Sequence, residues 1–450
     1  MSQQQMEQRV QFTKEMKSTH TILIPDMLPL HFKLLRNVLR QCGYQAELLQ
    51  NQGPQIAQLG LKYVHNDTCY PALLVIGQMI DALQSGRYDL DRIALMISQT
   101  GGGCRASNYI HLLRKALKKA GMGQIPVISL SANGMESNAG FQLTLPMLRK
   151  MLAAMVYGDE LMLLRNQTAP YQLAEGAAEA LAEQWVDRLT ALFEKGKGYS
   201  LRQAKPVLLE IARSFEAIPY LEKPKLKVGV VGEIYVKYAS LGNNNLEAFL
   251  RRQDCEYLIP GVLGFLFYCV DNQLTDIRLY GGSRARYGAV YAVLHYLMAF
   301  ENAMIDAVGQ TRFLPPGAYQ HKKGLAKGVV GYGSKMGEGW LLTAEMLELV
   351  DLGYPNIICT QPFGCLPNHI NGRGMLNKIK RLVPSANIVA IDYDPGAARV
   401  NQENRIKLML ASAKEAAQVE RQTAAQAEQP EAETEPAAVG GEGELAHSPT

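Results

Sequence analysis

Apolar and polar positions alternate along most of this chain in a way that predicts both strands and helices. Short apolar runs such as Thr21–Pro25, Arg92–Ser98 and Ile125–Leu130 are typical of buried strands. Between them, apolar residues recur every three or four positions, which indicates amphipathic helices at Leu30–Cys42 and Ala106–Ala120. This succession of strands and helices predicts an α/β fold with mainly parallel sheets.

The pattern changes twice further along the chain. Between positions 141 and 218 the strand signals vanish, and long helical stretches follow at Leu145–Leu164, Glu175–Phe193 and Leu201–Phe215. A second alternation starts at the strand Val228–Val231, whereas the glycine- and lysine-rich segment Arg312–Gly337 is expected to be irregular. The other expected elements are the helices Pro71–Leu83, Leu246–Arg252, 261–274, 283–309, Gly339–Leu352, Pro367–Leu382 and Ala397–Leu410, and the strands Tyr257–Ile259, Asn356–Thr360 and Asn387–Tyr393.

These changes divide the chain into four regions. We predict a Rossmann-like parallel-sheet unit at residues 1–140, a helical bridging subdomain at 141–218 and a second Rossmann-like unit at 219–412. Residues 413–450 consist largely of Ala, Glu, Gln, Pro and Gly. Because so few large apolar side chains cannot offset the entropy lost on ordering, we predict a disordered acidic tail there.

Composition narrows the class of protein. At 450 residues and 47% hydrophobic content the chain can bury more than one core, and a net charge of +4 is too small to indicate nucleic-acid binding. The seven cysteines lack the spacing of a disulfide scaffold, and the polar N-terminus carries no secretory pattern. The longest uncharged stretch, Tyr257–Val270, is too short to span a bilayer. We therefore expect a soluble cytoplasmic protein with reduced thiols and no membrane contact.

Three cysteines stand where an extended segment passes into a predicted helix: Cys69 in NDTCYP, Cys104 in QTGGGCR and Cys365 in QPFGCLP. Unpaired backbone N–H groups and the helix dipole stabilise a thiolate at such a position. Gly102 and Gly103 would let a ligand approach the backbone closely. We expect the three sulfur atoms to meet at the carboxyl edge of the sheets and bind a metal centre. The alternative for each segment is a tight turn with a buried thiol.

The spacing of the cysteines also bears on the kind of metal. Zinc usually takes four ligands, often in paired CxxC motifs, and this sequence contains no such motif. A cubane iron–sulfur cluster accepts cysteines at any spacing, and three ligands would leave one iron open for chemistry. Cys359, Cys269 and Cys255 are weaker candidate ligands, for which packing in the core is the alternative, and Cys42 is expected to be structural.

A second group of residues suggests a phosphorylated ligand. Lys322, Lys323 and Lys335 lie among glycines ahead of Glu338, so this segment could hold the phosphates of a coenzyme A tail. A solvated, flexible loop is the alternative. Glu233 follows the strand Val228–Val231 and could line the same edge of the sheet.

Five motifs together resemble the 2-hydroxyacyl-CoA dehydratase family. They are HNDTCYPA at Cys69, QTGGGCRASNY at Cys104, VGEIYVKY at Glu233, KMGEGW at Glu338 and QPFGCLPNHI at Cys365, and they span about residues 20 to 410. More narrowly, the chain is similar to the iron–sulfur, dehydratase-like module of activase-related proteins, in which an ATP-dependent activator module precedes it.

The resemblance implies that Cys69, Cys104 and Cys365 bind a 4Fe–4S cluster. Glu233 and Glu338 are our predicted catalytic residues. In the family, an ATP-hydrolysing iron–sulfur activator supplies a low-potential electron. That electron reduces the thioester carbonyl of a CoA substrate to a ketyl radical, which then expels a hydroxyl group. This chain contains no activator-type nucleotide-binding signature, so the resemblance implies a separate activator, together with a homo- or heterodimer.

Some relatives hold a double-cubane cluster and reduce small molecules instead. Cys359, Cys269 and Cys255 would raise the number of available ligands here to six. The expected function is therefore radical dehydration, as a lyase, or low-potential reduction of a CoA-type or small substrate. A non-catalytic cluster-bearing accessory or electron-relay subunit is the alternative. A metal-free thiol enzyme, with Cys104 as nucleophile and His111 or His369 as base, is a third interpretation.

Overall fold

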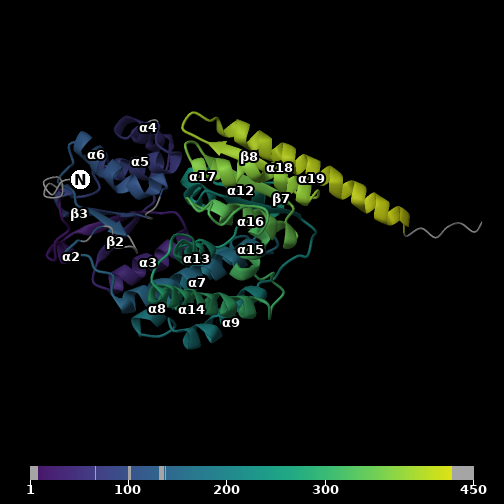
Figure 1. Cartoon of the computed structure of the whole chain (residues 1–450), viewed down its shortest axis with the longest axis horizontal. Helices are drawn as coiled ribbons and strands as arrows, with labels where there is room; N and C mark the ends of the chain where they lie inside the picture. Colours follow the sequence, from purple (N-terminus) through teal and green to yellow (C-terminus); the bar gives the residue numbers. More distant parts are fainter. Residues whose placement is uncertain (1–8, 66, 100–102, 131–135, 137, 428–450) are drawn as a thin grey trace, which may run out of the picture.

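The computed structural model describes residues 9–65, 67–99, 103–130, 136 and 138–427. These residues form two four-stranded sheets, each entirely parallel and covered by helices, so the predicted α/β fold with two Rossmann-like units is confirmed. Figure 1 shows the two units next to each other, with several helices of the middle of the chain, α7, α8, α9 and α14, packed below them.

The first sheet has the strand order β2-β1-β3-β4. Its strands are β1 (Thr21–Pro25), β2 (Gln45–Leu49), β3 (Ile93–Ser98) and β4 (Val127–Leu130). The apolar runs of β1 and β3 are buried almost throughout, as expected for strands covered by helices on both faces. Their helices are α2 (Met16–Thr19), α3 (Pro29–Gln41), α4 (Pro54–Tyr63), α5 (Tyr70–Gln84) and α6 (Tyr109–Lys119), with the short 3₁₀ turns η1 (Leu90–Arg92) and η2 (Arg105–Asn108).

The second sheet repeats this topology as β6-β5-β7-β8. Its strands are β5 (Leu226–Gly232), β6 (Cys255–Leu258), β7 (Asn356–Pro362) and β8 (Asn387–Tyr393). The chain runs from β5 to β6 on one side of β5 and later to β7 on its other side. Strands β5 and β7 therefore flank the topological switch point, where open α/β sheets bind ligands. Glu233 follows β5 directly, and Cys365 follows β7. The helices of this part are α10 (Ile234–Tyr238), α11 (Ser240–Asn243), α12 (Leu246–Arg252), α15 (Tyr319–Ala326), α16 (Gly339–Asp351), α17 (Leu366–Asn371), the 3₁₀ turn η3 (Arg373–Met375), α18 (Leu376–Leu382) and α19 (Arg399–Ala427).

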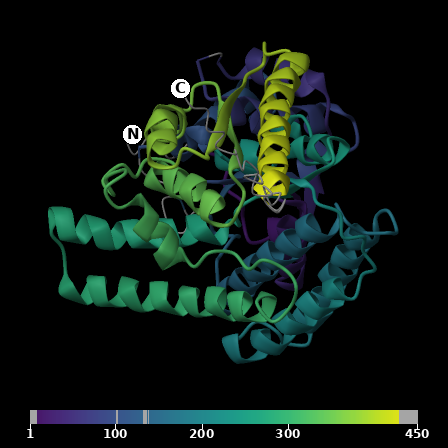
Figure 2. The same cartoon turned by 90° about the vertical axis from the view of Figure 1, so that its right-hand side faces the viewer.

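Five further helices complete the described part of the chain: α7 (Leu145–Thr168), α8 (Ala177–Glu194), α9 (Leu201–Glu216), α13 (Leu263–Tyr280) and α14 (Arg284–Val308). Helices α13 and α14 form a long hairpin that projects to one side in Figure 2. Helix α7 is buried along most of its second half and packs against α3, β6 and α14. On it, Asp159 accepts the backbone N–H groups of Val262 and Leu263, each at 2.9 Å, and lies 2.8 Å from the imidazole of His31. This carboxylate therefore joins α3 of the first unit to the start of α13.

The structure corrects four expectations. Strand β2 and helix α4 were not predicted, and Arg312–Gly337 contains helix α15 rather than only irregular chain. The single helix expected at Pro367–Leu382 is broken at Gly372 into α17 and α18. Helix α19 continues to Ala427, so the predicted disordered tail is wrong for its first part, and residues 428–450 lie outside the described residues. The other expected elements are confirmed, with ends shifted by a few residues.

Figure 1 shows α19 as a rod that extends away from the body of the molecule. Across the described part of the chain, no helix combines the length and the apolar character needed to cross a lipid bilayer.

Candidate metal centre

The three predicted ligand cysteines all occupy the residue that caps the start of a helix. Cys69 precedes α5, Cys104 precedes the 3₁₀ turn η2 that leads into α6, and Cys365 precedes α17. Each has an extended backbone conformation, and none uses its side chain to cap its own helix. The backbone N–H groups near the start of each helix nevertheless face the sulfur atoms, and those of Ala72, Ala106 and Asn368 partly offset the rise in thiol pKa that burial causes. The predicted position of each cysteine is confirmed.

The segments that carry Cys69 and Cys365 touch through their backbones, although they belong to different units. The N–H of Tyr70 donates to the carbonyl of Phe363 over 3.0 Å. Gly364 has a φ of 75°, and a Cβ at this position would lie 3.1 Å from the Cα of Cys69. A side chain here would be strained and crowded, so the glycine ahead of Cys365 permits the close approach. The loops of two predicted ligands thus meet between the units.

Cys104 reaches the same region from the first sheet. Burial is the main cause of the raised pKa of Cys104, and the charges of Glu338 and then Cys69 add to it, as expected if the thiol lies near both groups. A Cβ on Gly103 would lie only 2.6 Å from the Sδ of Met336, which places this loop against the segment before Glu338. Gly102 lies outside the described residues. The remaining predicted contributors to this edge, Glu233 and Glu338, come from the second unit.

Glu233 and Glu338 are held by backbone and amide donors. Oε2 of Glu233 accepts the N–H of Val236 over 2.9 Å and so caps α10. Oε1 of Glu338 accepts the N–H of Ile234 over 3.0 Å, and its Oε2 accepts Nδ2 of Asn368 over 2.8 Å. Since Ile234 is adjacent to Glu233, and Asn368 lies three residues after Cys365, both carboxyl groups are fixed beside the cysteine loops.

Burial and mutual repulsion determine the charge of this group. Burial raises the pKa of the Cys104 thiol to about 11 and also raises the pKa of Cys69 and of Cys365. The charge of Glu338 raises the pKa of Cys365 further. The pKa values of Glu233 and Glu338 are themselves raised, chiefly by burial. Without a cation, burial and mutual repulsion favour the protonated forms of these thiols and carboxyl groups, and a positively charged centre would favour their ionised forms.

Two hydrogen-bond partners of these sulfur atoms were missed by the sequence analysis. The hydroxyl of Tyr109, at the start of α6, lies 2.8 Å from the Sγ of Cys69. Nδ2 of Asn368, in α17, lies 3.4 Å from the Sγ of Cys365. Tyr109 and Asn368 each lie in the first turn of the helix that follows a predicted ligand. No other feature of the sequence indicates a role for them.

The other cysteines differ in how close they come to this group. Cys255 begins β6 and is paired in register with Leu226 at the start of β5, so it lies at the edge of the sheet opposite the carboxyl ends. Cys359 is fully buried within β7 between Val231 and Ala390. Cys269 lies on α13 and is exposed to solvent.

The predicted phosphate-binding lysines are engaged elsewhere. Nζ of Lys322 is buried and lies 3.0 Å from Oε2 of Glu348. Lys323 pairs with Asp271 at 2.6 Å, and Lys335 forms an ion pair with Asp276. A phosphate group would have to displace a carboxylate from each lysine.

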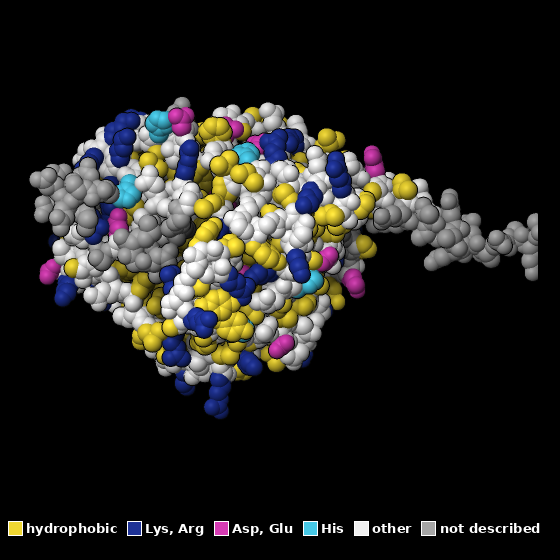
Figure 3. Space-filling model, in the orientation of Figure 1, with side chains coloured by type: hydrophobic (Ala, Val, Ile, Leu, Met, Phe, Trp, Pro, Cys, Tyr) yellow, Lys and Arg dark blue, Asp and Glu magenta, His cyan; other side chains and the backbone are white. Residues whose placement is uncertain are grey.

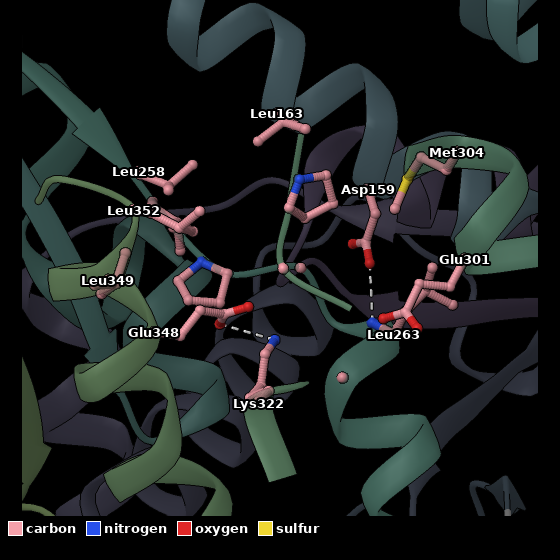
Figure 4. Close-up of a pocket in the computed structure, with 16 residues that line it drawn as sticks. Asp159, Leu163, Leu258, Leu263, Glu301, Met304, Lys322, Glu348, Leu349 and Leu352 are labelled. Atoms are coloured by element: carbon pink, nitrogen blue, oxygen red, sulfur yellow. Dashed lines mark hydrogen bonds and ion pairs between the residues drawn. The ribbon is translucent and has the colours of Figure 1, made fainter. Parts of the chain in front are cut away.

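A cavity lies beside Lys322, in the interior between α7, α13, α14 and α16 (Figure 4). Asp159, Glu301, Glu348 and Lys322 point toward it from different helices, and the rest of the lining is mostly apolar. It offers about 40 Å³ to a water-sized molecule. At roughly 10–15 Å³ per water, it has room for a few water molecules, not for a coenzyme.

The face of the molecule drawn in Figure 3 gives little indication of a single charged partner. In the face shown in Figure 3, Lys and Arg side chains are scattered between hydrophobic ones and do not gather in one patch. Four exposed apolar side chains, by contrast, come from the segments that bear Cys365 and Glu338: Met336, Phe363, Leu366 and Ile370.

Within the described residues, no three His, Cys, Asp or Glu side chains converge tightly enough to hold one metal ion among them. A cubane makes a different demand, because each cysteine binds a different iron and the ligands stand apart. Neither a scan against protein-family models nor a search of curated proteins finds a match for this chain.

Proposed function

We propose that this chain is an iron–sulfur protein in which Cys69, Cys104 and Cys365 hold a cubane cluster between the two α/β units. The observation that carries the proposal is the meeting of the Cys69 and Cys365 loops, with the Tyr70 N–H 3.0 Å from the Phe363 carbonyl. Two further observations support it: the charge coupling between Cys69 and Cys104, and the capping position of all three residues. Three cysteine ligands leave one iron without a protein thiolate.

The residues present fit such a group. The site combines soft sulfur donors with hydrogen-bond donors at 2.8 Å from Cys69 and 3.4 Å from Cys365. Cluster ligands usually have neighbours of this kind, because hydrogen bonds to the sulfur atoms help to set the potential. The group, when bound, would supply a low-potential electron to a CoA thioester or a small substrate. An ATP-hydrolysing iron–sulfur activator is the proposed source of that electron.

Glu233 and Glu338 are the proposed acid–base pair of the dehydration. Loss of water from a 2-hydroxyacyl group requires removal of a proton and protonation of the departing hydroxyl. A pair of carboxyl groups whose pKa values are raised by burial can hold a proton near neutral pH and return it. Backbone N–H donors fix one oxygen of each group, which leaves one oxygen of Glu233 for a substrate.

Anaerobic purification with iron and acid-labile sulfide counts tests the proposal. About four irons per chain indicate one cubane, and about eight a double cubane. Cys69→Ser, Cys104→Ser and Cys365→Ser should each lower the iron content. Cys42→Ser is the matched control, because Cys42 ends α3 away from the three loops and should leave iron unchanged. Wild-type protein without iron or sulfide would refute the proposal.

The accessory or electron-relay role is a second candidate, and the paired lysines favour it. Lys322, Lys323 and Lys335 each contact a carboxylate, so no free row of cations stands ready for the phosphates of coenzyme A. Calorimetric titration of iron-loaded protein with an acyl-CoA separates the two roles. Binding heat that is lost in Glu233→Gln supports a catalytic site, whereas absence of binding supports a relay.

The thiol-enzyme interpretation is disfavoured by the electrostatics of Cys104. A cysteine nucleophile needs a lowered pKa, whereas burial raises the pKa of Cys104 to about 11.

A further inference from the structure

Tyr109 stands out among the residues that surround the three cysteines. It is the first residue of α6, five positions after Cys104, yet its hydroxyl lies 2.8 Å from the Sγ of Cys69. The loop that carries one proposed ligand thus supplies a hydrogen bond to another. Its ring packs against the apolar core of the first unit, which holds the hydroxyl in place.

The direction of this hydrogen bond follows from the chemistry of the sulfur atom. A free thiol can donate to the phenol or accept from it, but a thiolate bound to iron carries no proton and can only accept. An ordinary tyrosine hydroxyl is protonated at neutral pH, and that of Tyr109 lies within hydrogen-bond distance of the Sγ of Cys69. Around a bound cluster, Tyr109 would therefore be the donor.

We propose that Tyr109 is a positioning residue that sets the reduction potential of the cluster through its hydrogen bond to Cys69. This inference rests on the proposed function. A donated hydrogen bond withdraws electron density from the sulfur atom and stabilises the more negative, reduced state more than the oxidised state. Loss of the bond should make the potential more negative, so that the protein demands a stronger reductant.

The variant Tyr109→Phe removes the hydroxyl and keeps the ring. Tyr235→Phe is the matched control, because the Tyr235 hydroxyl is also buried near Glu233 but has no hydrogen-bond partner among the described residues. Iron and sulfide are counted first in all three proteins. A redox titration followed by electron paramagnetic resonance then gives each midpoint potential.

We expect equal iron contents, a more negative midpoint in Y109F and an unchanged midpoint in Y235F. A second measurement detects the hydrogen bond itself. Exchange into deuterated water should shift the iron–sulfur stretching bands in the wild type, and this shift should be smaller in Y109F.

The outcomes separate the inference from the proposed function. Iron-free wild-type protein would refute both. A loaded Y109F protein with the wild-type midpoint would refute the role of Tyr109 and leave the cluster proposal standing. Loss of iron in Y109F alone would also refute the inference, because Tyr109 would then hold the cluster in place instead of setting its potential. An equal shift of the midpoint in Y235F would refute it as well, because the effect would not come through Cys69.

Discussion

The crossing of α4 and α5 determines where Cys69 lies, and it can be tested with one added methyl group. The two helices meet backbone to backbone at Gly60 and Gly77. A Cβ on Gly77 would lie 2.1 Å from the carbonyl oxygen of Ile56, and one on Gly60 would lie 2.3 Å from the carbonyl oxygen of Leu73. Backbone atoms cannot rotate away as a side chain can. The helices must therefore separate by about 1 Å to reach normal contact in Gly77→Ala.

Two opposing effects determine how much Gly77→Ala changes the free energy of unfolding. Overpacking of this kind costs about 1–3 kcal/mol, and a rigid backbone neighbour favours the upper part of that range. Alanine returns up to about 1 kcal/mol because it is the better helix former. Gly77→Ala should therefore lower the free energy of unfolding by about 1–2 kcal/mol. For a folding unit of 150–250 residues, this corresponds to a fall in the unfolding midpoint of about 2–8 °C.

Gly288→Ala provides the matched control. Gly288 also lies inside a helix, α14, but is exposed, and a Cβ there would have no heavy atom within 4 Å. The same chemical change should therefore raise the midpoint slightly, by the helix-propensity term alone. Thermal unfolding followed by circular dichroism measures both variants. If Gly77→Ala were as stable as Gly288→Ala, the close crossing would be refuted.

Three further predictions concern charge and ligands. Burial raises the pKa of Asp26 to about 6, so the wild type loses stability as the pH rises from about 4 through 6. The Asp26→Asn variant should be more stable than the wild type by up to about 3 kcal/mol at pH 8 and equally stable at pH 4. Thermal unfolding at both pH values tests this, and a stability difference that does not change with pH would contradict it. Lys237 and Glu345 form a buried ion pair at 3.2 Å. Lys237→Met should lower the free energy of unfolding, measured by chemical denaturation, by about 3–5 kcal/mol, and adding Glu345→Met should restore most of it. A double variant as unstable as Lys237→Met alone would contradict this explanation. Cys269→Ser should keep the wild-type iron content, and loss of iron would add this residue to the ligand set.

Most of the fold could be predicted because its strands are short apolar runs between glycine-bearing turns. The missed elements lack that signal. Strand β2 has the sequence QAELL without a β-branched residue, and its Glu47 finds its partner in the distant Tyr88 hydroxyl, at 2.6 Å. Helix α15 contains glycine and paired lysines, and it is stabilised by tertiary contacts such as that of Lys322 with Glu348. Helix α19 was underestimated because alanine, glutamate and glutamine favour helices even without apolar side chains.

The candidate site, like the fold, has local features that could be predicted from the sequence and long-range contacts that could not. The position of each cysteine at a helix start is local, so its sequence neighbours predicted it. Contacts across the chain were not predictable from one sequence. Tyr109 contacts Cys69, which is 40 positions away in the sequence, and Lys335 pairs with Asp276, which is 59 positions away. The latter contact changes the interpretation of the lysine segment, because a charge that is already paired is not free for a phosphate.

The arrangement of the proposed ligands has a mechanical consequence. Cys69 and Cys104 belong to the first sheet unit and Cys365 to the second, and a backbone hydrogen bond from Tyr70 to Phe363 connects the loops of Cys69 and Cys365 directly. A cluster held by all three would join the two units by covalent iron–sulfur bonds at the place where the substrate would enter. Because it would bind the assembled pair of units and not the separated ones, loading would stabilise their relative orientation by mass action. The same bonds that place the electron donor would then fix the carboxyl groups of Glu233 and Glu338 beside it, so that redox and proton chemistry depend on one junction.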